Sequence, residues 1–304
     1  MEIGIEKIRT GLSFLQVVKS PEGLARYVYG PNKSVESTDK YQIALSLAEN
    51  PIIRLTVALA LSSAPHELSS REREGILLFT GLVTHADDVL DGNTIFSGEN
   101  ELRSAILNHS FQMGSKSIAL NHLLDTTFTH FPQDKQKIIT DFVDHMITIH
   151  VNGIHRGKAG EYGYQDALEY KQQTNSAYMA IALRLVDASP SQVEKMSPLI
   201  LVGQLLDDST DFWTDARAEV KNLYLGKARD VWVNNNCPAN QDLGFICLVI
   251  TEASFVPLRT KQTMRLPALH DTRQAYKEEF DSALRAVDNI ALKKLLQIYG
   301  NHQL

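Results

Sequence analysis

The chain has 304 residues and a formal net charge of −6, with 43% hydrophobic and 22% charged residues. This is an ordinary soluble composition, and the length can bury a large core in one or two domains. The negative net charge argues against a general nucleic-acid-binding protein, because that role needs a basic surface. The two cysteines, Cys237 and Cys247, are too few for a disulfide framework or a cysteine-based zinc site, so buried reduced thiols are expected.

Neither a membrane span nor an export signal is expected from the sequence. The chain contains no apolar run of the roughly 18 residues that a membrane helix requires. Residues 1–16 mix charged residues into their apolar positions and lack the hydrophobic stretch of a signal peptide. A cytoplasmic location is therefore the prediction.

Apolar residues recur at three- and four-residue steps along nearly the whole chain, which is the period of an amphipathic helix. A capping box at Ser69–Glu72, and another at Ser189–Gln192, mark two helix starts. No convincing strand pattern, internal repeat or linker interrupts the series, so we predict one all-α domain over residues 1–304. In chain order, the predicted helices are Glu2–Val18, Lys40–Leu61, Arg71–Leu90, Glu101–His130, Gln133–Asn152, Gln165–Asp187, Gln192–Lys221, Asp242–Phe255 and Thr272–Tyr299.

A first acidic cluster lies at the end of the third predicted helix. Residues Thr80–Gly92 read TGLVTHADDVLDG and follow a strongly apolar run. They contain Asp87, Asp88 and Asp91. On a helix, Asp87 and Asp91 lie one turn apart on nearly the same face.

A second acidic cluster lies within Leu201–Leu225, which reads LVGQLLDDSTDFWTDARAEVKNLYL. Asp207, Asp211 and Asp215 recur at steps of four and predict an acidic stripe along one helix face, with Asp208 beside it. Like charges at that spacing destabilise an isolated helix by roughly 0.2–0.5 kcal/mol per pair. Taken alone, the stripe could equally be a solvated acidic face.

Two D-D-x-x-D clusters on separate helices are much rarer than one, and together they favour metal binding. Mg²⁺ takes oxygen ligands and commonly binds through one or two carboxylates plus the phosphates of a substrate. If the two helices face each other, the clusters would hold several Mg²⁺ ions around a diphosphate. The ions would neutralise the charge that develops as the diphosphate leaves.

The two clusters resemble the aspartate-rich motifs of the isoprenoid synthase superfamily, all-α enzymes that ionise allylic prenyl diphosphates. Thr84–Gly92 resembles the first motif, and Gln204–Asp211 resembles the second motif of trans-prenyl diphosphate synthases. Tyr276–Tyr299 resembles the family's last helix, so the motifs are spread from about Asn50 to the end of the chain. The resemblance implies a helical bundle around a central apolar cavity, a prenyl diphosphate substrate and three Mg²⁺ ions. A homodimer is a further expectation, since members often form one.

Three segments depart from the pattern of chain-elongating members. Asn50–Arg54 takes the place of a G-K-x-x-R segment and keeps only Arg54, while Gln173 stands where the family's K-T segment has lysine. Phe96–Gly98 replaces a segment that usually carries two arginines. In the family these cations bind isopentenyl diphosphate, and a second diphosphate needs a cationic pocket of its own. The departures therefore favour a class I terpene synthase, a lyase that uses one allylic diphosphate.

The second cluster is similar to the motifs of two kinds of enzyme. Asp207, Asp211 and Asp215 reproduce the spacing of the (N/D)-x-x-x-(S/T)-x-x-x-E motif of terpene cyclases. The same segment resembles squalene and phytoene synthases, with Gln204 before the D-x-x-x-D-A-R of Asp211–Arg217 and a Tyr224-Leu225 pair after it. Head-to-head or chain-elongating prenyl transfer therefore remains the alternative.

The resemblance assigns roles to individual residues. Asp87 and Asp91 would bind two Mg²⁺ ions, and Asp207 and Asp211 the third; these four residues form the catalytic set. Further metal-binding candidates are Asp88, Asp208 and Asp215. The candidates for binding diphosphate oxygens are Arg54, Arg217 and Lys221. Aromatic faces could stabilise an allylic cation by roughly 2 kcal/mol when desolvated. The aromatic candidates, for which core packing is the alternative, are Phe79, Tyr178, Phe212 and Trp213.

Three hypotheses follow from the sequence. The first is a class I terpene synthase, and the second is a prenyltransferase. The third is a non-catalytic helical partner or regulatory subunit that keeps the fold. Two complete carboxylate clusters count against the third, because a scaffold has no reason to retain such charge repulsion.

Overall fold

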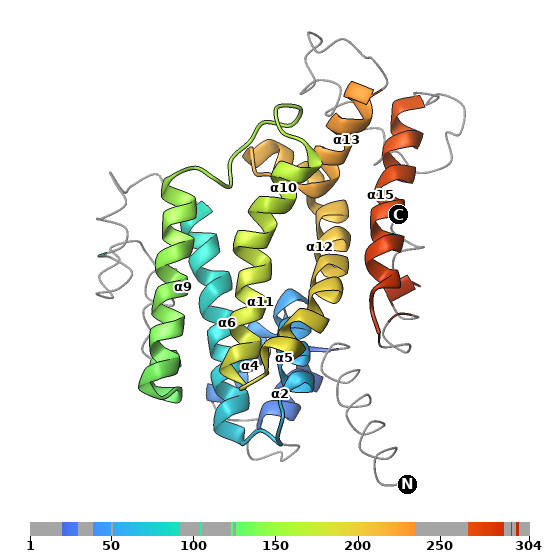
Figure 1. Cartoon of the computed structure of the whole chain (residues 1–304). Coiled ribbons are helices and arrows are strands. Elements are labelled where there is room, and N and C mark those ends of the chain that lie inside the picture. Colours follow the sequence, from blue (N-terminus) through green and yellow to red (C-terminus); the bar gives the residue numbers. More distant parts are fainter. Residues whose placement is uncertain are drawn as a thin grey trace, which may run out of the picture. The chain divides into compact units, whose positions relative to one another are not determined.

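The computed structural model describes residues 20–29, 39–49, 51–91, 104, 123, 126–234, 267–288, 293, 296 and 297. Within these ranges the chain is helical and contains no strand, apart from an isolated bridge between Arg156 and Val220 (Figure 1). The prediction of an all-α protein is confirmed for this part of the chain. The predicted helices Glu2–Val18 and Asp242–Phe255, and most of Glu101–His130, lie outside it.

The helices follow the apolar periodicity but divide differently from the prediction. The predicted helix Lys40–Leu61 is two helices, because proline at position 51 lacks an N–H and is favoured at the first position of a helix. Two short helices without a predicted counterpart lie at Pro21–Tyr29 and Leu223–Asn234. The observed elements are α2 (Pro21–Tyr29), α4 (Asp39–Leu47), α5 (Pro51–Ser63), α6 (Ser70–Asp91), α9 (Gln133–Val151), α10 (Tyr164–Lys171), the π-helix η1 (Gln172–Ser176), α11 (Ala177–Leu185), α12 (Pro190–Ala218), α13 (Leu223–Asn234) and α15 (Pro267–Arg285).

The chain divides into two compact units, whose boundaries fall just after α9, after the first residue of α11 and inside α12. The first unit comprises Met1–Asn152 and Tyr178–Val193, and the second comprises Gly153–Ala177 and Glu194–Leu304. A single domain over the whole chain stays a prediction.

Helix α6 is the centre of the first unit and contacts α2, α4, α5 and α9. The Ser69–Glu72 capping box starts it, with the Ser69 N–H donating to Glu72 Oε2 at 2.8 Å. The Phe79 ring of α6 lies 6.3 Å from the Phe142 ring of α9 and 5.8 Å from the Tyr178 ring of α11. Each such fully buried ring contributes roughly 1.5–3 kcal/mol to folding. This aromatic cluster joins three helices that are distant in sequence.

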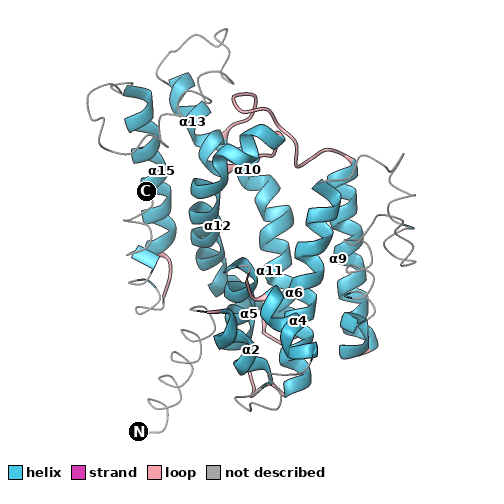
Figure 2. Ribbon diagram, turned by 180° about the vertical axis from the view of Figure 1, so that it is seen from behind, coloured by secondary structure: helices cyan, strands magenta, loops and turns pink. Residues whose placement is uncertain are grey.

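Helix α13 is the centre of the second unit and lies between α10 and α15 (Figure 2). The contact with α10 is close, since a Cβ on Gly226 of α13 would lie 2.6 Å from the carbonyl oxygen of Gly163. Asp230 of α13 also accepts the Tyr164 N–H at the start of α10, at 2.9 Å. The Tyr276 hydroxyl of α15 donates to the buried carbonyl of Leu205 in α12, at 2.8 Å. These contacts fix α10, α12, α13 and α15 around one core.

None of the helices in the described ranges is long and apolar enough to cross a membrane.

Candidate functional site: the acidic face of α12

The acidic stripe predicted from the sequence lies on α12, and its carboxylates differ in exposure. Asp207 and Asp215 are half-buried, and Asp211 is exposed. Asp208 is almost completely buried, with 1% of its surface exposed. Because one residue turns a helix by about 100°, Asp208 points away from the stripe and into the unit.

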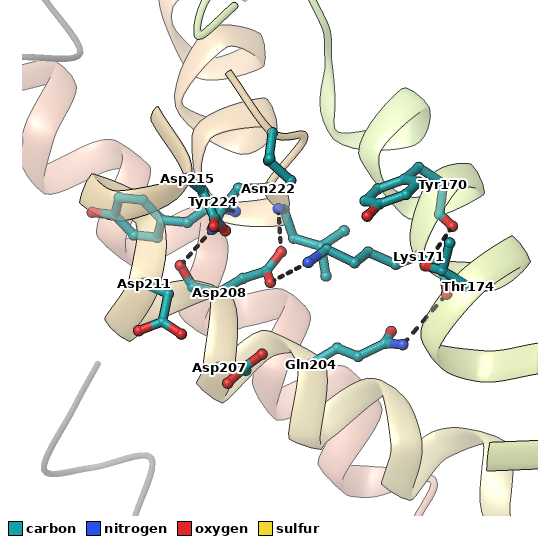
Figure 3. A network of polar contacts seen from close by, with 12 residues as sticks. Tyr170, Lys171, Thr174, Gln204, Asp207, Asp208, Asp211, Asp215, Asn222 and Tyr224 are labelled. Carbon is teal, nitrogen blue, oxygen red and sulfur yellow. Dashed lines mark hydrogen bonds and ion pairs between the residues drawn. The ribbon is translucent and has the colours of Figure 1, made fainter. Parts of the chain in front are cut away.

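Asp208 forms a buried ion pair with Lys171, the last residue of α10 (Figure 3). The Lys171 Nζ lies 2.7 Å from Asp208 Oδ1. Burial alone would lower the pKa of Lys171, but the negative charge of Asp208, with that of Tyr170 and Asp215, raises the pKa above its usual value. Lys171 is therefore a permanent cation beneath the acidic stripe.

The second oxygen of Asp208 is also bound by the protein. Asp208 Oδ2 accepts the backbone N–H of Leu223, the first residue of α13, at 2.6 Å. A carboxylate at a helix N-terminus is stabilised by the positive end of the helix dipole. One oxygen of Asp208 thus binds α10 and the other binds α13. Asp208 therefore has a structural role in addition to the metal-binding role predicted for it.

Asn222 connects α12 to α13 through both ends of its side-chain amide. Its Oδ1 accepts the N–H of Tyr224 at 2.8 Å, which makes it the N-cap of α13. Its Nδ2 donates to the Asp208 carbonyl at 2.9 Å and to Asp215 Oδ2 at 2.8 Å. The position of the Asp215 carboxylate is therefore set by the turn between the two helices.

That turn begins at Glu219, which adopts a left-handed backbone with φ 55°. The Val220 N–H donates to the Asp215 carbonyl at 2.9 Å, closing the α12 C-terminus as in a Schellman motif. Glycine usually occupies this position, because a side chain makes the conformation cost about 1–2 kcal/mol. The strained turn brings the start of α13 back onto Asp208.

Negative charge on the stripe exceeds what Lys171 neutralises. Burial, followed by repulsion from Asp208, raises the pKa of Asp207 to about 7 despite the opposing effect of Lys171. Burial likewise raises the pKa of Asp215 to about 6, against the lowering effects of Lys171 and of the hydrogen bond from Asn222. Asp211 points away from Lys171 (Figure 3). Carboxylate oxygens are the donors that Mg²⁺ prefers, but the structure does not bring an oxygen from each of Asp207, Asp211 and Asp215 within 4.8 Å of the other two.

The first acidic cluster is helical, as predicted. Asp87, Asp88 and Asp91 lie in the last turns of α6, and their side chains are outside the description. Negative charge at a helix C-terminus is unfavourable, because the helix dipole is negative there. A cation would relieve this repulsion. The metal-binding roles of these residues, and the expectation that the two clusters face each other, stay predictions.

The three candidate diphosphate ligands lie in different settings. Arg54 of α5 donates from Nη1 to the carbonyl of Glu49 at 3.0 Å and also to that of Ala48, so it caps the end of α4. Arg217 is exposed in the last turn of α12, and Lys221 is half-buried just beyond it. Arg217 and Lys221 share the C-terminal end of the acidic helix with Asp215.

The described aromatic candidates pack against other aromatic rings. Phe212 lies 5.2 Å from Tyr224, which in turn lies 5.0 Å from Tyr276. Phe79 and Tyr178 belong to the aromatic cluster of the first unit. The side chain of Trp213 lies outside the description. A cation–π role for these residues stays a prediction.

Sequence reasoning missed Lys171 and Asn222. The K-T resemblance indicated position 173 for the family's lysine, and this chain has Gln173 there. The buried cation is Lys171, two residues earlier and directly before the π-helix η1. A π-turn inserts an extra residue into a helix and shifts the following side chains around its axis. Asn222 carried a local signal, an N-cap residue type directly before an apolar helical run.

No protein-family model matches the chain, and no curated protein and no solved structure matches it.

Proposed function

We propose that the protein is a Mg²⁺-dependent class I terpene synthase, a lyase that converts an allylic prenyl diphosphate into a terpene hydrocarbon or alcohol and free diphosphate. The observation that carries the proposal is the acidic stripe of α12, in which burial and neighbouring carboxylates raise the pKa of two members. Asp207 and Asp215, with pKa values raised to about 7 and about 6, lie on one helix with exposed Asp211. Sites that bind metal through carboxylates concentrate charge in this way, whereas structural carboxylates are usually paired, as Asp208 is.

In this proposal the two acidic clusters bind the metal, and the Lys171–Asp208 pair positions the second cluster. Asp207, Asp211 and Asp215 would hold Mg²⁺ on α12, and Asp87 and Asp91 would hold it on α6. Bound Mg²⁺ supplies charge neutralisation for the leaving diphosphate. Lys171 holds Asp208, and Asp208 holds the start of α13, so the backbone that carries the stripe is fixed before substrate binds.

Arg217 and Lys221 are the preferred diphosphate ligands. Arg217 follows Asp215 in the last turn of α12, and Lys221 lies just beyond the helix, so a phosphate held by metal on the stripe would lie near them in the chain. An arginine guanidinium binds phosphate oxygens in a bidentate manner, and lysine adds a compact positive charge. Arg54 is the weaker candidate, because its guanidinium already caps α4.

Head-to-head prenyl transfer is the second candidate function. It is favoured by the sequence around the stripe, in which Gln204 precedes Asp211 and Asp215, and Tyr224 and Leu225 follow. Gln204 is buried, with its amide nitrogen 3.5 Å from the Lys171 carbonyl. The missing cations for a second diphosphate speak against it.

Turnover assays separate these functions. The purified chain is incubated with Mg²⁺ and farnesyl, geranylgeranyl or longer diphosphates, with and without isopentenyl diphosphate. A hydrocarbon or alcohol from a single substrate supports the terpene synthase. Longer diphosphates, or a product that joins two prenyl chains, support the prenyltransferase.

A matched pair of variants gives the assay its control. Asp211→Asn removes one charge from the stripe, and Asp134→Asn removes one from an exposed site at the start of α9. The proposal expects product from Asp134→Asn and none from Asp211→Asn. No product and no diphosphate release with any substrate would support a non-catalytic partner.

A further inference from the structure

A second group of metal-ligating side chains lies in the first unit. His66 lies in the connection between α5 and α6, Glu72 in the first turn of α6, and Asp187 in the connection between α11 and α12. One ligand atom from each lies within 4.8 Å of the other two. The group combines an imidazole nitrogen with two carboxylates, so it differs from a purely acidic surface patch.

The spacing within this group fits a tetrahedral metal ion. His66 Nε2 and Glu72 Oε1 are 3.3 Å apart. Two ligands at zinc's usual bond lengths of about 2.0–2.2 Å in tetrahedral geometry are separated by about 3.3 Å. Asp187 contributes a ligand oxygen that lies within 4.8 Å of both atoms.

Neighbouring contacts hold one oxygen of each carboxylate, and the other oxygen of Glu72 faces His66. The Ser69 N–H and hydroxyl both donate to Glu72 Oε2, at 2.8 and 2.7 Å, while Oε1 faces the imidazole. Lys135 Nζ donates to Asp187 Oδ2 at 2.9 Å and to the Leu185 carbonyl at 2.8 Å. Hydrogen bonds of this kind orient the ligands of protein metal sites.

A further contact ties the two connections together. The Gln192 amide at the start of α12 donates to the Ser63 carbonyl at the end of α5, at 3.2 Å. The same side chain accepts the Ser189 N–H at 2.7 Å, which fixes the turn that follows Asp187. His66 and Asp187 therefore project from two segments that are held near each other without any ion.

We propose that His66, Glu72 and Asp187 form a binding site for a divalent transition-metal ion, with Zn²⁺ as the best fit. One nitrogen and two oxygen ligands suit Zn²⁺, whereas Mg²⁺ prefers oxygen alone in an octahedral arrangement. The side chains of His66, Glu72 and Asp187 are 46%, 36% and 52% exposed, so an ion can enter and water can supply the fourth ligand. The bound ion would cross-link the α5–α6 and α11–α12 connections.

Zinc titration of the full-length protein tests this site, with millimolar Mg²⁺ present to occupy carboxylates that bind through oxygen alone. The site predicts saturable binding of one Zn²⁺ per chain. His66→Ala and Asp187→Asn should each weaken it at least about tenfold, a loss that even an orienting partner produces. Asparagine suits Asp187, because that residue has φ 61° and asparagine tolerates the left-handed conformation.

His145→Ala is the matched control, since it removes another exposed histidine from the same unit. It should bind Zn²⁺ as tightly as the unaltered chain. Co²⁺ in place of Zn²⁺ should give the intense visible absorption of a four-coordinate ion in both proteins and not in His66→Ala. Equal Zn²⁺ affinity in His66→Ala and His145→Ala, or no saturable binding in the unaltered chain, would overturn the proposal.

Discussion

Replacing Lys171 with methionine tests how the acidic face of α12 is held. Methionine keeps most of the length and the apolar stem of the side chain but removes the charge that Asp208 faces at 2.7 Å. Asp208 would stay buried, at 1% exposed, with a single remaining hydrogen bond to its side chain, from the Leu223 N–H. Removing one partner of a buried ion pair costs about 3–5 kcal/mol, because the other charge remains desolvated. We expect the free energy of unfolding to fall by that amount.

Lys137→Met is the control for this measurement. Lys137 also lies 2.7 Å from a carboxylate, that of Asp141, but the two side chains are 74% and 62% exposed. An exposed pair contributes only about 0–1 kcal/mol, so the two variants compare ion pairs of equal length that differ in burial. Urea denaturation followed by circular dichroism gives both free energies.

A double variant identifies the cause of the loss. In Lys171→Met with Asp208→Asn, the buried residue is neutral and its amide oxygen can still accept the Leu223 N–H. Part of the lost stability should return, and the double-mutant cycle should show coupling of more than about 1 kcal/mol. A Lys171→Met variant as stable as Lys137→Met would refute the reasoning.

Four further predictions concern the second unit. Glu219→Gly should raise the free energy of unfolding by about 1 kcal/mol, because glycine adopts φ 55° without strain; a loss in urea denaturation would contradict the turn. Gly226→Ala should lower it by about 1–3 kcal/mol in the same assay, because the new Cβ would lie 2.6 Å from a backbone oxygen, and an unchanged value would argue against the close packing of α10 and α13. Mg²⁺ affinity, measured by calorimetry, should increase as the pH rises through about 6, where Asp215 loses its proton, and through about 7, where Asp207 does. An affinity that does not change with pH would exclude both residues as ligands. In the metal-free protein the raised pKa of Asp207 has the opposite consequence, since stability should fall as the pH rises from its unfolded value of 3.8 toward about 7.

Local patterns predicted much of the fold. The Ser69–Glu72 capping box and the apolar spacing after it placed α6 to within one residue at each end. The same periodicity runs through residue 51 without a gap, so the break between α4 and α5 depended on proline chemistry. The π-helix η1 was invisible for a related reason, because a single inserted residue barely alters the pattern of apolar residues.

The candidate site was predictable only in part. Four-residue spacing placed Asp207, Asp211 and Asp215 on one face of a helix, and helical geometry alone turns Asp208 away from them. The partner of Asp208 could not be read from the sequence, because contact with Lys171 depends on how α10 packs in the folded unit. Burial of the stripe, which raises the pKa of Asp207, is likewise a property of the packed structure.

The proposed function requires the acidic residues of α6 and α12 to bind one diphosphate together through Mg²⁺. Calorimetric titration with inorganic diphosphate tests it directly, with and without Mg²⁺, in the unaltered chain and in Asp87→Asn, Asp211→Asn and Asp134→Asn. Mg²⁺-dependent diphosphate binding should survive in Asp134→Asn and be lost in both Asp87→Asn and Asp211→Asn. Diphosphate binding without Mg²⁺, or full binding in Asp87→Asn or Asp211→Asn, would contradict it.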